Sequence, residues 1–342
     1  IYICNIKDRV ERLIYTSSNK VTILRYAVNS VTFATDETIR VIDATTSKEL
    51  SNTTLQLTKK GQRLEISPNG KKIATSFGNN EVHISDSNGE SISVIDVTFG
   101  RNSINKFALS AEGRYLACTY YGNSKFNKPN EIVIWDTQST SISNFQVIPT
   151  GGVPSSIVFS SDGLKFACFV QDERGTNKTA VHLYSKIMER DTNNASKDAV
   201  QLWDTNPDKL PIKFPPDVRL SFGTSSTALA IYNKYQVDFF SFDSTAGRYA
   251  IDHLATRRFP SFDIGYRTIY EPINDIAISS HRNEIAFVTG QGLVVRSLLA
   301  EEQVYYSEET YSQVKFSADE TFLIAIGQSM IDVFVAGYPN EY

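Results

Sequence analysis

The stretch LEISPNG at residues 64–70 decides the fold, because it recurs as FALSAEG at residues 107–113 and as IVFSSDG at residues 157–163. Each copy alternates apolar and variable residues, as a β-strand does, and then ends in a cluster of turn-forming residues. Weaker copies are LIYT at 13–16, LSFG at 220–223, IAIS at 276–279 and VKFS at 314–317. Internal repetition of this kind predicts a repeat architecture with about seven units.

Further strands follow each copy. After the turn, a second apolar run predicts a returning strand, as in KIAT at 72–75 and YLAC at 115–118. A third strand often ends in aspartate, at Asp43, Asp86, Asp136 and Asp204, and a more polar fourth strand leads to the next repeat. Four strands in roughly 40–50 residues make up one propeller blade. The sequence therefore predicts an all-β fold, a seven-bladed β-propeller of four-stranded antiparallel blades that forms a single domain over residues 1–342.

Two short motifs carry a family resemblance. Trp135-Asp136 and Trp203-Asp204 look like the WD dipeptide, and Ser67-Pro68-Asn69-Gly70 looks like the Ser-Pro-Asp-Gly turn of the same family. The sequence thus resembles a divergent WD-repeat β-propeller over nearly its whole length. The family's Gly-His dipeptide is missing throughout, so the buried Asp-His-Ser-Trp network of the family is not expected here. Related propeller families with the same turn remain open.

The two ends of the chain suggest how the propeller closes. The last repeat supplies three strands, at residues 311–317, 321–326 and 330–335, and lacks a fourth. The N-terminal IYICNI at residues 1–6 precedes the first repeat and is expected to complete the last blade as its outer strand. Such a strand hides an edge that would otherwise template aggregation. The chain begins at Ile1, so we expect it to be part of a longer chain.

Composition narrows the partners and the compartment. The net charge of −4 argues against a nucleic-acid partner, because nucleic-acid binders usually carry a basic excess. Cys4, Cys118 and Cys168 form neither a disulfide framework nor a zinc motif, and they are expected to be buried thiols in a reducing compartment. We therefore expect an intracellular protein, cytoplasmic or nuclear.

The sequence carries none of the common linear motifs of catalysis. The sequence has no nucleophile elbow, no phosphate-binding loop and no zinc-protease motif, and its four histidines are scattered. It therefore predicts no enzymatic activity, no metal, no cofactor and no small-molecule substrate. A propeller can also combine active residues from separate blades, so a hydrolase or lyase remains an alternative.

One position in the repeat is often basic. Two variable residues precede each apolar-x-apolar step, and the second of them, directly before the step, is expected beside the mouth of the central channel. Through the seven repeats this position holds Arg12, Arg63, Lys106, Ser156, Arg219, Asp275 and Gln313. Four basic residues in an acidic chain predict a positive ring that binds an acidic peptide or segment. The competing interpretation is that each one pairs with a carboxylate of a neighbouring loop.

Long connections are expected on the same face. Residues 256–272 link the fifth and sixth repeats and mix arginine with aromatic residues, the types enriched at binding hot spots. The candidate contact residues there are Arg257, Arg258, Phe259, Phe262, Tyr266 and Arg267. The alternative is a loop that buries these aromatics against its own blade. Residues 122–130 and 171–199 are expected between second and third strands, although the latter can instead form a hairpin around residues 181–184.

These features favour a non-catalytic scaffold for protein–protein interaction, with other proteins of a complex as partners. The first alternative is a membrane-surface propeller. Arg257-Arg258 is similar to the Phe-Arg-Arg-Gly motif of the phosphoinositide-binding autophagy propellers, but Thr256 and Phe259 stand where that motif has Phe and Gly. The second alternative is the hydrolase or lyase named above.

Overall fold

The computed structural model describes most of the predicted strands and their tight turns. The described residues are 2–5, 10–13, 21–27, 30–35, 38–43, 46, 48–54, 63–76, 81–97, 104–122, 130–138, 145–171, 179–185, 200–204, 218–224, 228–234, 237–243, 248–251, 262–264, 267–269, 272–280, 283–297, 303–317, 320, 322–327 and 331–335. All regular elements in these ranges are β-strands. No helix among them is long and apolar enough to cross a membrane.

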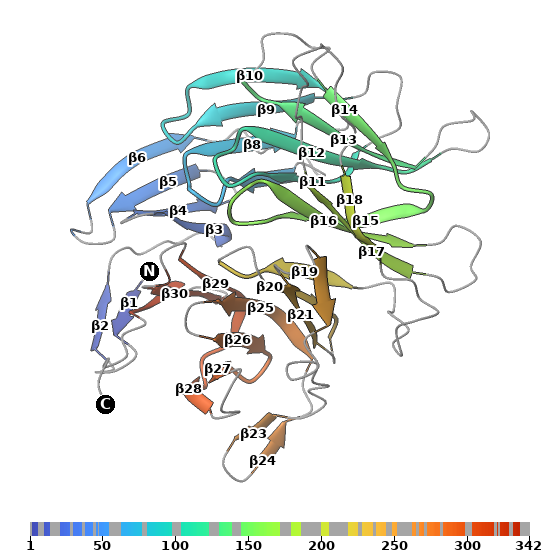
Figure 1. Ribbon diagram of the computed structural model, residues 1–342. Coiled ribbons are helices and arrows are strands. Elements are labelled where there is room, and N and C mark those ends of the chain that lie inside the picture. Colours follow the sequence, from blue (N-terminus) through green and yellow to red (C-terminus); the bar gives the residue numbers. More distant parts are fainter. Residues whose placement is uncertain are drawn as a thin grey trace. The chain divides into compact units, whose positions relative to one another are not determined.

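The chain divides into two compact units (Figure 1). Unit 1 comprises Ile1–Gln56, Ser221–Ser241 and Ile251–Tyr342, and unit 2 comprises Leu57–Leu220 and Phe242–Ala250. In the described part of the chain the strands form six four-stranded sheets, one five-stranded sheet and one two-stranded sheet.

Unit 2 contains three four-stranded antiparallel sheets, each built from strands that follow one another in sequence. The first sheet consists of β7 (Arg63–Ile66), β8 (Lys72–Ser76), β9 (Glu81–Asp86) and β10 (Ser91–Asp96). The second consists of β11 (Ile104–Leu109), β12 (Tyr115–Tyr120), β13 (Glu131–Asp136) and β14 (Phe145–Pro149). The third consists of β15 (Val153–Phe159), β16 (Lys165–Gln171), β17 (Thr179–Ser185) and β18 (Val200–Asp204).

Unit 1 repeats the same meander. One sheet consists of β3 (Val21–Ala27), β4 (Ser30–Thr35), β5 (Thr38–Asp43) and β6 (Glu49–Thr54). Another consists of β25 (Ile273–Ser279), β26 (Glu284–Thr289), β27 (Leu293–Ser297) and β28 (Gln303–Ser307). The sheet of β19 (Arg219–Phe222), β20 (Ala228–Tyr232), β21 (Val237–Asp243) and β22 (Arg248–Ile251) contains residues of both units.

The last sheet is completed by the N-terminus, as the sequence predicted. β29 (Tyr311–Phe316), β30 (Phe322–Gly327) and β31 (Ile331–Val335) form its first three strands, and β1 (Tyr2–Asn5) lies beside β31. The β1–β31 pairing is parallel, with Ile3 opposite Val333. β2 (Val10–Leu13) then pairs antiparallel with β1 and adds a fifth strand. The edge of β31 is therefore covered by a two-stranded hairpin.

The assignment of residues 13–16 to the first strand of a repeat is wrong. Leu13 ends β2 in the last sheet, and the corresponding first strand is β3, which is antiparallel to β4. The alternating apolar pattern at residues 13–16 does not distinguish an inner strand from an outer one. The apolar run at Val21–Ala27 supplies the long partner that β4 requires.

The tight turns confirm the predicted physical role of the repeated motif. Ser160 Oγ accepts a hydrogen bond from Lys165 N at 3.0 Å and donates one to Asp162 Oδ1 at 2.5 Å. Gly163 N bonds Ser160 O at 2.9 Å, and Gly163 has a φ of 69°. A positive φ costs glycine little, which explains the glycine at this position of the turn. Gly70 and Gly113 have φ values of 71° and 65° in the equivalent turns.

The aspartates that end third strands order the next turn. Asp86 Oδ1 accepts hydrogen bonds from Asn88 N and Glu90 N, both at 2.9 Å, and Asp43 Oδ1 accepts one from Thr46 N at 2.6 Å. Asp136 Oδ1 accepts one from Gln138 N at 3.0 Å. The side chain thus forms an Asx-type turn that leads into the outer strand.

Asp204 was wrongly assigned to a third strand. It ends β18, the fourth strand of its sheet, and the third strand is β17, which is antiparallel to β16. The placement of residues 171–199 between the second and third strands is therefore wrong as well, because this segment contains the third strand, and residues 181–184 lie within it. Both strands have the same apolar pattern, and the pairing partner, which lies far away in the sequence, decides their order.

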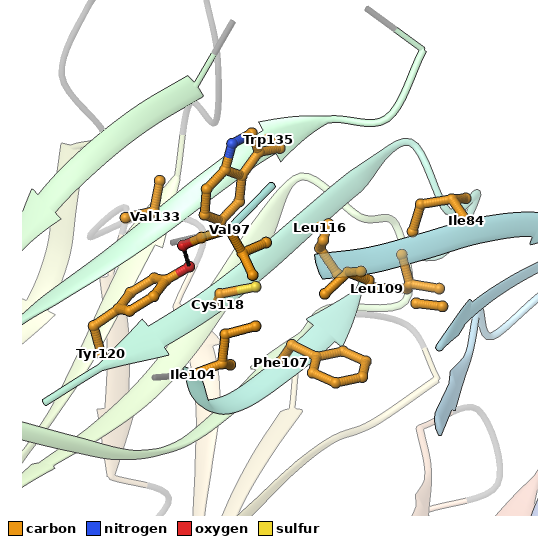
Figure 2. Packing of buried hydrophobic residues seen from close by; sticks show 12 residues of the cluster. Ile84, Val97, Ile104, Phe107, Leu109, Leu116, Cys118, Tyr120, Val133 and Trp135 are labelled. Atoms are coloured by element: carbon orange, nitrogen blue, oxygen red, sulfur yellow. Dashed lines mark hydrogen bonds between the residues drawn. The ribbon is translucent and has the colours of Figure 1, made fainter. Parts of the chain in front are cut away.

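A continuous core joins two sheets of unit 2. Ala74, Val82 and Ile84 of the β7–β10 sheet pack with residues of the β11–β14 sheet (Figure 2). Tyr120 is almost fully buried, meets Trp135 edge-on at a centroid distance of 6.4 Å, and donates a hydrogen bond to Val97 O at 2.8 Å. This bond satisfies the phenol that would otherwise be costly to bury.

Candidate partner-binding site

Five first strands carry a structural landmark close to the predicted binding position. In five sheets this strand has a β-bulge, which falls at Thr22, Asn105, Ser155, Asn274 and Ser312. A bulge bends the strand and re-aims the side chains beside it. The predicted position is the residue directly after the bulge, so strand register and sequence repeat define the same place.

Register identifies the residue that occupies this position in each sheet. Lys106 pairs with Thr119, Ser156 with Phe169, Asp275 with Val288, and Gln313 with Ile326. Arg63 and Arg219 are the first residues of β7 and β19, and each lies four residues before the turn. The equivalent residue on β3 is Ile23, which is opposite Ala34.

Arg12 therefore does not occupy this position of a first strand. Arg12 lies on β2 opposite Ile3, in the outer hairpin of the last sheet. The three remaining basic residues, Arg63, Lys106 and Arg219, all belong to unit 2. The equivalent residues of unit 1 are Ile23, Asp275 and Gln313. The basic character of this position is thus concentrated in one unit.

Lys106 is the best-defined member of the set. Its side chain is exposed, and it forms no ion pair with any residue that the structure describes. Thr119 Oγ1 accepts a hydrogen bond from Lys106 N at 3.1 Å, which fixes the backbone beside the bulge. Arg219 is exposed as well and follows the buried Val218.

The bulged residues hold neighbouring first strands in place. Asn105 Nδ2 donates a hydrogen bond to Pro154 O at 3.0 Å, from β11 to the residue before the bulge of β15. Asn274 Nδ2 makes the equivalent bond to Tyr311 O at 3.5 Å in unit 1. β7 also contacts β11, and β11 contacts β15. The binding position is therefore presented on a backbone that is fixed between sheets.

In unit 1 the same position is used internally. Asp275 is buried and accepts hydrogen bonds from Tyr232 OH at 2.8 Å and from Val314 N at 3.1 Å. Lys315 Nζ lies 3.4 Å from its second carboxylate oxygen. These contacts tie β25 to β20 and β29. The acidic residue at this position is thus bonded internally, whereas the basic Lys106 is exposed.

The connection at residues 256–272 is only partly described. Arg257, Arg258, Phe259 and Tyr266 lie outside the described residues. Phe262 and Arg267 belong to a two-stranded hairpin of β23 (Phe262–Ile264) and β24 (Arg267–Ile269), in which Phe262 faces Ile269 and Arg267 faces Ile264. The predicted loop therefore contains a hairpin of its own. The connection at 122–130 joins the second and third strands of its sheet, as predicted.

The described residues offer little reactive chemistry. No group of three or more His, Cys, Asp or Glu side chains among them is placed to hold a metal ion. Burial raises the pKa of the Cys168 thiol far above its usual range, so this cysteine stays protonated. Cys118 is a buried free thiol as well.

Several structural side chains were not identified from the sequence. They are the bulge residues Asn105 and Asn274 and the buried Glu320, whose partners lie on other sheets. The one available signal is positional: an asparagine two residues before the buried apolar-x-apolar step occurs in both INKFAL and INDIAI.

Comparison with known proteins supports the fold. No protein-family model matches the sequence, and no curated protein matches it. The Cps50 (Swd1) β-propeller domain of Myceliophteria thermophila superposes with a TM-score of 0.63 and 13% identity, over 94% of this chain and 98% of that chain. Kuenenia stuttgartiensis hydrazine synthase gives a TM-score of 0.62 and 12% identity, over 94% and 97%. At such low identity the likeness concerns architecture, and the chain has an all-β, propeller-type fold.

Proposed function

We propose that this chain is a divergent WD-type propeller with seven blades, and that it is a non-catalytic scaffold that binds an acidic segment of a partner protein. In this proposal the seven sheets of four or five strands are the blades, and Arg63, Lys106 and Arg219 contact the acidic segment. The observation that carries the proposal is the recurrence of a basic residue four residues before the turn on three first strands of unit 2. On β11 this residue, Lys106, directly follows a bulge.

The charge of the chain supports this proposal. A chain with a net charge of −4 has no general reason to place cations at three of the four equivalent positions in one unit. In the proposed propeller these cations would converge on one face, where an anionic group of the partner would lower their electrostatic free energy. Lys106 meets no carboxylate among the described residues, so it is available to an external one.

The turn geometry supports the WD-type assignment. The Ser160–Asp162 hydrogen bond and the left-handed Gly163 form a compact turn from the residue types that the Ser-Pro-Asp-Gly motif supplies. Trp135-Asp136 ends a third strand, where Asp136 orders the following turn. The absence of the Gly-His dipeptide from the sequence makes the chain a divergent case.

The test is affinity purification from cell extract, followed by mass spectrometry. Wild type is compared with the triple variant Arg63→Glu, Lys106→Glu and Arg219→Glu. Arg12→Glu is the matched control, because it changes the same charge on an outer strand of unit 1. The proposal predicts an acidic partner that is retained by wild type and by the control and is lost from the folded triple variant.

Two results would replace the proposal. Retention of the same partners by the triple variant would assign the three cations a structural role. Binding to phosphoinositide vesicles that is lost in Arg257→Ala and Arg258→Ala, with no protein partner found, would favour the membrane-surface alternative.

A further inference from the structure

A second surface lies on the outer strand of the β7–β10 sheet. In the described part of the chain β10 pairs with β9 and ends its sheet. Alternate N–H and C=O groups of such an edge strand point away from the sheet, where they can accept another strand. β10 has the sequence SISVID, with neither proline nor lysine, the residues that commonly protect an edge.

β10 also exposes apolar side chains. Among the described residues five large apolar side chains are exposed, and two of these are Ile92, at 44%, and Val94, at 50%. The opposite face of the same sheet is packed: Val82 and Ile84 are fully buried, and Ile95 packs against their cluster. Ile92 and Val94 are therefore not part of this core cluster of unit 2.

Acidic groups surround this apolar pair. Residues 81–97 contain Glu81, Asp86, Glu90 and Asp96 and neither lysine nor arginine. Asp96 lies directly opposite Glu81, and Val94 lies opposite His83, so these four side chains share one face of the β9–β10 ladder. Glu81 Oε2 lies 3.4 Å from Nε2 of His83, which shares this face. Residues 81–97 still carry four carboxylates and neither lysine nor arginine, so their charge favours a basic partner.

We infer that β10 is a docking edge for an extended segment of a partner protein that carries alternating apolar and basic side chains. Its backbone would extend the sheet, its apolar side chains would cover Ile92 and Val94, and its cation would lie beside Asp96 and Glu81. A second copy of β10 is a poorer occupant, because it brings the same carboxylates and no cation. This inference concerns a partner of opposite charge to that of the proposed function and is independent of it.

The bulge defines where the segment fits. The register of β10 against β9 shifts between Ser91 and Ser93, and it is regular from Ser93 to Asp96. A bulge interrupts strand pairing. The docked strand is therefore expected to pair with Ser93–Asp96 and to end near Ile92.

The test uses a fluorescein-labelled peptide in which valine alternates with threonine and lysine, together with the same peptide carrying glutamate in place of lysine. Fluorescence anisotropy measures the binding of each peptide to the full chain. We expect the lysine peptide to bind in a salt-sensitive manner. We expect Val94→Lys to weaken binding about tenfold or more, because it removes apolar contact and adds a repelling charge.

Leu50→Lys is the matched control, since Leu50 is 55% exposed on β6, the outer strand of another sheet. It should leave the affinity unchanged, and Asp96→Asn should reduce the salt dependence. Equal binding of the lysine and glutamate peptides, equal binding by wild type and Val94→Lys, or no binding of the lysine peptide would overturn the inference. Self-association that disappears in Val94→Lys would overturn it in favour of a second copy.

Discussion

Glu320 combines an unfavourable backbone conformation with a well-bonded buried carboxylate. It occupies the turn position that glycine fills in the equivalent turns at Gly70, Gly113 and Gly163, with a φ of 58°. A left-handed conformation costs a residue with a side chain about 1–2 kcal/mol. Glu320 is nevertheless 2% exposed and ends a turn closed by its own N–H to Ser317 O at 3.0 Å.

Its carboxylate connects three turns of unit 1. It accepts hydrogen bonds from Ser279 Oγ at 2.5 Å, from Ser280 N at 3.0 Å and from Thr224 Oγ1. Each hydrogen bond to a charged group contributes about 1.5–3 kcal/mol. Ser280 N keeps a second acceptor, Thr224 Oγ1 at 3.2 Å, when the carboxylate is removed. The loss therefore concerns mainly the two hydroxyl donors.

We predict that Glu320→Gly lowers the free energy of unfolding by about 2 kcal/mol or more, because the lost hydrogen bonds outweigh the strain relieved. The strain that is relieved is about 1–2 kcal/mol, and the greater freedom of glycine in the unfolded chain offsets much of it. Urea unfolding followed by circular dichroism measures the change in midpoint at constant slope.

Asn283→Gly is the control for the free-energy cost of the left-handed backbone conformation. Asn283 has a φ of 52° at the corresponding turn of the β25–β28 sheet, and its side chain is exposed. We expect its stability to lie within about 0.5 kcal/mol of wild type, because asparagine tolerates this conformation. A Glu320→Gly variant as stable as wild type, beside a neutral Asn283→Gly, would refute the reasoning about Glu320.

Three further predictions concern packing and edges. Tyr120→Phe should lower the free energy of unfolding by about 1 kcal/mol, since it removes the buried bond to Val97 O; an unchanged urea midpoint would contradict this. Gly113→Ala should cost about 1–3 kcal/mol more than Gly151→Ala in thermal melts, because both glycines have a positive φ but only a Cβ at Gly113 would meet a side chain, at 2.7 Å. Deletion of residues 1–13 should lower the melting temperature and cause concentration-dependent association on size exclusion, because it uncovers β31; a monomer of unchanged melting temperature would show that this hairpin is dispensable.

The turns were predicted well from the sequence because they are closed by hydrogen bonds between residues that are close in sequence. The Ser160–Gly163 turn is closed by groups within six residues of one another, so its residue types alone identify it. The same holds for Asp86, which bonds the backbone two and four residues ahead. First and second strands of most sheets were therefore located from their turns.

Long-range pairing explains the errors. Residues 10–13 and 21–27 both form short strands, and only pairing with β1 or with β4 shows which of them is the outer strand and which is the first strand. Trp203-Asp204 likewise resembles the end of a third strand but lies on β18, because β17 pairs with β16 first. Arg12 was grouped with the basic residues of the first strands for the same reason, because residues 13–16 were assigned to a first strand.

Photo-crosslinking tests the central claim most directly. A photo-reactive amino acid in place of Ser156 lies directly after the bulge of β15, a strand that contacts the strand of Lys106, and it leaves all three cations intact. The control replaces Leu164, which is 64% exposed in the turn beyond the other end of β15. Our account predicts that an acidic partner crosslinks from the Ser156 position and not from the Leu164 position. Crosslinks from Leu164 alone, or equal crosslinks from both positions, would contradict binding by the basic residues of unit 2.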